Sequence, residues 1–203
     1  MRVDRDALVA SAIRLSFVTI GWNGAIGACA LVVGLTTGSL ALAGFALNAL
    51  LDSSASIVLV WRFRKEQVDP EAAERLERRA QTWIIGAMLV VALYVGSAAV
   101  RALIGGSHPE SSTLGVLIAA VSLAVLPTLG AMKVRLAARI ESQALRGDGV
   151  LTLAAAMLAA ITLVALLLSS RLGWWWADPL AALVIAVALA TEGTRVAVRH
   201  RFG

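Results

Sequence analysis

Two carboxylates stand inside or at the edge of long apolar runs of this sequence, and each has a polar neighbour four positions away. Asp52 is the only charged residue between positions 38 and 61, and it follows Asn48 by four. Asp148 precedes Thr152 by the same interval. Residues i and i+4 share one face of a helix, so each pair would present its oxygen atoms together. If the two faces meet, two carboxylates, an amide oxygen and a hydroxyl would surround a divalent cation.

The ligand types narrow the choice of ion. Oxygen-only ligation suits Mg²⁺, Mn²⁺ or Fe²⁺ better than Zn²⁺, which prefers histidine and cysteine. Both histidines, His108 and His200, lie outside the apolar runs, and the single cysteine, Cys29, excludes a cysteine-based metal cluster. We therefore predict no catalytic residues and no tightly bound cofactor, and we predict four metal ligands: Asp52, Asp148, Asn48 and Thr152.

Structural explanations stay open for each of these residues. Asp52 could be a structural acid that is hydrogen-bonded to a serine or asparagine of a neighbouring helix. Asp148, near the start of its apolar run, could be a solvated cap of its own helix. Asn48 and Thr152 belong to residue types that commonly form hydrogen bonds between membrane helices. Asn23 is interpreted as a packing residue of this kind.

The elements that must position these side chains are membrane helices. The chain has 203 residues, of which 59% are hydrophobic and 15% charged, and this is not a soluble composition. Long apolar runs cross a bilayer as helices, and an acid at the bilayer centre costs about 2.5–3.5 kcal/mol unless it has a polar environment. We predict a single-domain, all-α membrane protein, a bundle of six transmembrane helices at about 15–35, 38–61, 82–100, 114–132, 148–168 and 174–194.

Basic residues are distributed unevenly between the predicted loops. Sixteen of the 18 lie on the side of the termini, including six in the charged segment 62–81, and only Arg101 and Arg171 lie on the other side. The positive-inside rule then places both termini and the loop 62–81 in the cytoplasm. It also explains the net charge of +5 without nucleic acid as a partner. Trp174–Trp176 is predicted to lie at the outer interface, and Asp178 is predicted to cap the last helix.

Three motifs together resemble the cation diffusion facilitator family of metal transporters. They are SLALAGFALNALLD, which ends in Asn48-x3-Asp52, SQALRGD followed by Thr152, and Trp176-Ala-Asp178-Pro179. The resemblance implies six helices with cytoplasmic termini, a metal site made by the second and fifth helices, and a homodimer. Because only 191–203 follow the sixth apolar run, it implies the short branch that lacks the cytoplasmic C-terminal domain. That branch would have an acid at position 48 and another near Ile26, and both positions are neutral here.

The predicted function is therefore proton-coupled efflux of a divalent cation (zinc, manganese, iron or similar) across the plasma membrane. Asp52 and Asp148 would bind the ion, and Asn48 and Thr152 would complete its shell. The alternative is a non-transporting, membrane-embedded relative that binds a partner protein. An enzyme is not expected, because the sequence has no nucleophile–base pair. The expected partners are the metal ion as substrate, the lipid bilayer and a second copy of the chain.

Overall fold

The computed structural model describes residues 2–66, 70–106, 109–110 and 112–202, and every regular element in these ranges is an α-helix. Each of the six helices contains an apolar stretch long enough to cross a membrane. The predicted all-α, six-helix membrane fold is therefore confirmed. In chain order the helices are α1 (Arg2–Thr37), α2 (Leu40–Glu66), α3 (Pro70–Gly105), α4 (Thr113–Ile140), α5 (Gln143–Leu172) and α6 (Ala177–Phe202).

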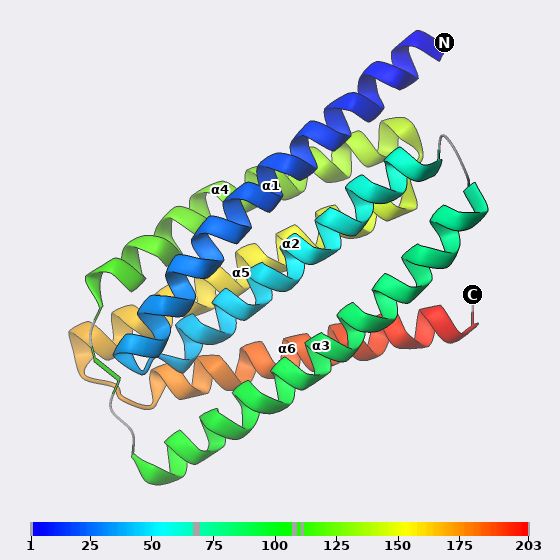
Figure 1. Ribbon diagram of the computed structural model, residues 1–203. Helices are drawn as coiled ribbons and strands as arrows, with labels where there is room; N and C mark the ends of the chain where they lie inside the picture. Colours follow the sequence, from blue (N-terminus) through cyan, green and yellow to red (C-terminus); the bar gives the residue numbers. More distant parts are fainter. Residues whose placement is uncertain (1, 67–69, 107–108, 111, 203) are drawn as a thin grey trace.

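The helices pack as three close pairs, and α2 also contacts members of the other two pairs. The pairs are α1 with α2, α4 with α5, and α3 with α6, and α2 also contacts α3, α5 and α6. Figure 1 shows α1, α2, α4 and α5 as one group, with the α3–α6 pair along its edge. Helix α2 therefore contacts both parts of the bundle, as α5 does through α6, and α2 carries Asp52 near its centre.

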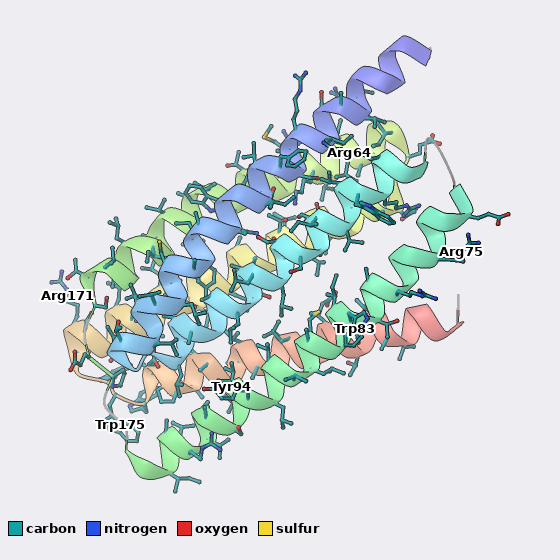
Figure 2. All side chains as sticks on the ribbon, viewed as in Figure 1. Arg64, Arg75, Trp83, Tyr94, Arg171 and Trp175 are labelled. Carbon is teal, nitrogen blue, oxygen red and sulfur yellow. The ribbon has the colours of Figure 1, made fainter. Side chains whose placement is uncertain are left out.

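Both chain ends lie at the same end of the bundle, which we call the terminal end (Figure 1). Figure 2 shows Arg64 and Arg75 toward this end, and Arg171 and Trp175 toward the opposite, distal end. At the distal end the rings of Trp174 and Trp176 stack, with centroids 5.1 Å apart. Both termini therefore lie at one end and Arg171 at the other, as the uneven distribution of basic residues predicts for a six-helix membrane protein.

Several helices continue beyond their predicted spans. Residues 62–66 extend α2, and 70–81 form the first turns of α3, so the described parts of the charged segment 62–81 are helical. Helix α4 runs to Ile140, eight residues beyond the predicted end at 132. Its end is set by Glu141, whose left-handed backbone (φ 55°) directs its amide to the carbonyl of Ala137. Charged residues do not end a helix by themselves, whereas a left-handed residue does.

Asp178 does not cap its own helix, so that prediction is wrong. Its side chain reaches across to the start of α2 instead, where it accepts hydrogen bonds from the Ser39 hydroxyl and the amides of Leu40 (2.8 Å) and Ala41 (3.4 Å). The Ser39 hydroxyl in turn accepts from the amide of Leu42 (3.1 Å). A carboxylate is favourable at a helix N-terminus, so this contact joins α6 to α2 at the distal end.

Candidate functional site

Asp52 and Asp148 lie in one buried cluster, and Thr152 joins them. Asp52 and Asp148 are each exposed over only 6% of the residue surface, and Thr152 is fully buried. The Thr152 hydroxyl lies 3.0 Å from the Asp148 carbonyl oxygen and 3.5 Å from Oδ2 of Asp52, and it can donate its single hydrogen to either. Three of the four predicted ligands are thus brought together between α2 and α5.

Asp52 has one occupied and one open carboxylate oxygen. Oδ2 accepts a hydrogen bond of 2.5 Å from the side-chain amide of Asn23, on α1. Oδ1 is buried and accepts no hydrogen bond from any residue that the structure describes. The packing role predicted for Asn23 therefore includes an interaction with the site itself: its amide fixes the orientation of Asp52 and leaves Oδ1 as the oxygen available to a ligand.

The cluster also contains Lys133, one of the sixteen basic residues counted on the side of the termini, which follows directly on the predicted span 114–132. Lys133 is wholly buried within α4. Its Nζ lies 2.7 Å from Oδ2 of Asp148, 3.1 Å from the Thr152 hydroxyl and 3.3 Å from the Ser56 hydroxyl. Ser56 donates onward to Oδ1 of Asp148 at 2.7 Å. The predicted end of this span at residue 132 is wrong, because α4 continues through Lys133.

Asp148 is consequently a buried ion-pair partner and not a solvated helix cap. The cap of α5 is Ser142, whose hydroxyl accepts from the amide of Leu145 at 3.3 Å. Asp148 lies beyond that first turn, and both of its carboxylate oxygens have a partner in Ser56 or Lys133. Of the two explanations that the sequence left open for Asp148, the cap is therefore excluded.

The close approach of α4 and α5 brings Lys133 to Asp148. A Cβ atom on Gly149 would stand 3.0 Å from the backbone nitrogen of Val134 and 3.0 Å from Cβ of Lys133. A Cβ atom on Gly130 would stand 2.7 Å from Leu153 and 3.1 Å from the carbonyl oxygen of Gly149. Only glycine leaves space for this crossing, because any Cβ would force the backbones apart.

A sequence signal for Lys133 existed in the periodicity of α4. The buried residues of this helix recur every three to four positions and continue past Lys133 to Ala137 and Ile140. A lysine on the buried face of a membrane helix needs a charged partner, and Asp148 is the nearest acid in the following helix. Ser56 carried a similar signal, since it follows Asp52 by four residues on the same face of α2.

Asn48, the fourth predicted ligand, lies outside the hydrogen-bonded cluster. It is half-buried and lines a cavity of about 320 Å³ between α2, α3, α5 and α6, together with Asp52. A second cavity of about 730 Å³ is lined by Asp148 and by the start of α5 at Gln143 and Arg146. The two cavities share lining residues from all four helices: Ala55, Ile84, Met88, Leu151 and Glu192. Asp52 therefore lines one cavity and Asp148 the other, and the two cavities adjoin along these shared residues.

All of the candidate ligand atoms are oxygens, and the ammonium of Lys133 lies among them. No group of three histidine, cysteine, aspartate or glutamate residues that could hold a metal ion occurs in the part of the chain that the structure describes. A cation at this place would use the carboxylates of Asp52 and Asp148, the Thr152 hydroxyl and the Asn48 amide, which are hard ligands. With all three groups ionised, two carboxylates and Lys133 give the cluster a formal charge of −1, so it attracts a cation.

Comparison with known proteins gives concordant matches. The family model described as the cation efflux transmembrane domain matches residues 16–200. The cation-efflux pump FieF of Shewanella oneidensis is 29% identical over 171 residues, which cover 80% of this chain and 56% of the pump. An uncharacterized transporter of Synechocystis sp. is 26% identical over 165 residues, which cover 79% of this chain and 53% of that protein. The chain thus spans about half the length of these curated relatives. Because the family model matches nearly all of the six-helix bundle, the chain belongs to the cation efflux family of multi-pass membrane proteins.

Proposed function

We propose that this protein transports a divalent metal cation out of the cytoplasm, with Asp52, Asp148, Thr152 and Asn48 as its ligands. The observation that carries the proposal is the cluster itself: the acids of α2 and α5 lie together around Thr152 inside a membrane-spanning bundle. Intramembrane acids that face a bundle interior typically mark an ion pathway. Membership of the cation efflux family supports the same function.

The two cavities suggest how the ion arrives. Asp148 and the start of α5 line the larger cavity and Asp52 lines the adjoining one, while Asp178 joins α2 to α6 at the distal end. We assign the terminal end to the cytoplasm because the basic residues collect there. A cytoplasmic ion would then enter through the larger cavity, which Asp148 lines, and reach Asp52 and Asn48 in the adjoining one. Release would follow an opening of the distal end, in exchange for protons, with the protein acting as a homodimer in the plasma membrane.

Metal uptake by inverted membrane vesicles tests this function. Wild-type vesicles with an acidic lumen are expected to accumulate Mn²⁺, Fe²⁺ or Zn²⁺, and a pH-sensitive dye in the lumen should report proton loss as the metal enters. Asp52→Asn removes one ligand charge and should lower uptake by at least about tenfold, the effect expected when support for a metal ligand is lost. Glu110→Gln removes an exposed carboxylate that is remote in sequence from the site and serves as the matched control.

Two results would contradict the proposal. Equal uptake by wild type and Asp52→Asn would show that transport does not use this site. A folded wild-type protein that moves none of the metals would refute divalent transport and favour the partner-binding alternative. Both variants must therefore be shown to reach the membrane in amounts equal to the wild type.

A further inference from the structure

Lys133 occupies the space between two of the proposed ligands. Its ammonium donates hydrogen bonds to the hydroxyls of Thr152 and Ser56 at 3.1 and 3.3 Å, and it forms an ion pair with the carboxylate of Asp148 at 2.7 Å. Two of these acceptors, the Asp148 carboxylate and the Thr152 hydroxyl, are the groups that a metal ion would use. The ammonium thus has the coordination environment of a bound cation, supplied by the chain itself.

A divalent ion and this ammonium cannot share the site without strong repulsion. Both would contact Asp148 and Thr152, and like charges at such distances repel strongly in a buried environment where water does not screen them. With the ammonium in place, Oδ1 of Asp52 is the carboxylate oxygen of the cluster that has neither a hydrogen bond nor an ion pair among the described residues, and Asn48 lines the same cavity as Asp52. One carboxylate oxygen and one amide make a weak site for a doubly charged ion.

We propose that Lys133 is a tethered competitor of the transported cation, so that it sets the affinity of the site; this inference rests on the proposed function. While the ammonium holds Asp148, the ion contacts Asp52, and it gains Asp148 and Thr152 only when the ammonium moves away. The four-carbon stem of lysine supplies the rotatable bonds for this movement. When the ion leaves, the ammonium returns to Asp148. The empty carrier therefore never holds two bare carboxylates, which would be costly in the membrane interior.

Direct metal binding to purified protein tests the inference. Lys133→Met removes the ammonium and keeps an unbranched apolar side chain, so Mn²⁺ and Zn²⁺ should bind at least about tenfold more tightly, the lower limit for coupling between close charges. Arg135→Met removes an exposed positive charge from the same helix and should leave the affinity unchanged. Isothermal titration in detergent gives the dissociation constants. Lys133→Gln retains a donor for Asp148 or Thr152, and it replaces the methionine variant if that variant does not fold.

The wild-type protein offers a second measurement, because the sequence contains only two lysines, Lys65 and Lys133. Reductive methylation followed by mass spectrometry should show Lys133 protected in metal-free protein and modified in the presence of saturating Mn²⁺ or Zn²⁺. The modification of Lys65 serves as the internal control and should not change. Tighter binding by the variant, together with metal-dependent modification of Lys133, supports displacement of the ammonium.

Two other results overturn the inference, and they can be told apart. If wild type and both lysine variants bind metal with equal affinity, and Lys133 stays protected when metal is bound, the lysine is purely structural and the proposed function stands. If neither the wild type nor any lysine variant binds a divalent ion, the proposed function fails together with the inference.

Discussion

The crossing of α4 and α5 can be tested with two glycines of α5 that lie two residues apart. Gly149→Ala places a Cβ atom 2.9 Å from Cγ2 of Val134 and 3.0 Å from the backbone nitrogen of the same residue. Rotation of the valine side chain can relieve the first contact, but the second involves backbone and requires the helices to separate. Overpacking of this kind costs about 1–3 kcal/mol. Gly147→Ala is the control, because nothing lies within 4 Å of its added Cβ.

Both variants gain the same helix propensity, about 1 kcal/mol for replacing glycine by alanine, so this contribution cancels in their comparison. Gly149→Ala should therefore be less stable than Gly147→Ala by about 1–3 kcal/mol, the overpacking cost alone. The free energy of unfolding is measured by titration with sodium dodecyl sulfate in mixed micelles, followed by circular dichroism. If the two variants agree within about 0.5 kcal/mol, the variation usual for surface substitutions, then close packing at Gly149 does not hold α4 against α5.

Two further predictions concern the distal end and the orientation of the bundle. Asp178→Asn replaces a carboxylate that accepts three hydrogen bonds by an amide with a single oxygen. It should lower the free energy of unfolding in the same titration by about 0.5–2 kcal/mol, as for loss of a helix cap. A free energy of unfolding equal to that of Glu110→Gln would refute the role of Asp178 as a cap of α2. In a Cys29→Ala background, a membrane-impermeant maleimide added outside intact cells should label Arg171→Cys and not Arg75→Cys, and the reverse pattern would contradict cytoplasmic termini.

The sequence predicts the features of this structure that depend on local composition, and it does not predict those that depend on contacts between helices. Hydropathy locates all six membrane spans, because an apolar run in a bilayer has no alternative to helix formation. It does not locate the helix ends, since the charged residues of α2 and α3 prolong their helices beyond the apolar spans. Glu141 ends α4 through its backbone conformation, and no composition rule predicts a left-handed glutamate.

The candidate site shows the same division. The i,i+4 spacing of Asp148 and Thr152 predicts their shared face, and α2 and α5 do bring Asp52 to them. The partner of Asp148 could not be predicted from spacing alone, because the contact with Lys133 depends on how closely α4 and α5 approach. A hydropathy profile treats Lys133 as the first residue of a loop. The close crossing of α4 and α5 makes Lys133 the third charged group of the site, beside Asp52 and Asp148.

The contact of Asp178 with the first amides of α2 makes the distal end a natural pivot. Asp52 lies twelve residues beyond Leu40, and so about 18 Å along the axis at 1.5 Å per residue, whereas Glu66 lies about 39 Å away. A tilt of α2 by about 10° around this point would move Asp52 by about 3 Å and the terminal end of the helix by about 7 Å. A small rotation is thus magnified at the terminal end of α2, which moves more than twice as far as the carboxylate. Because about 3 Å exceeds the 2.5 Å between the Asp52 carboxylate and the Asn23 amide, the same tilt would also change the contacts of Asp52 with α1 and α5.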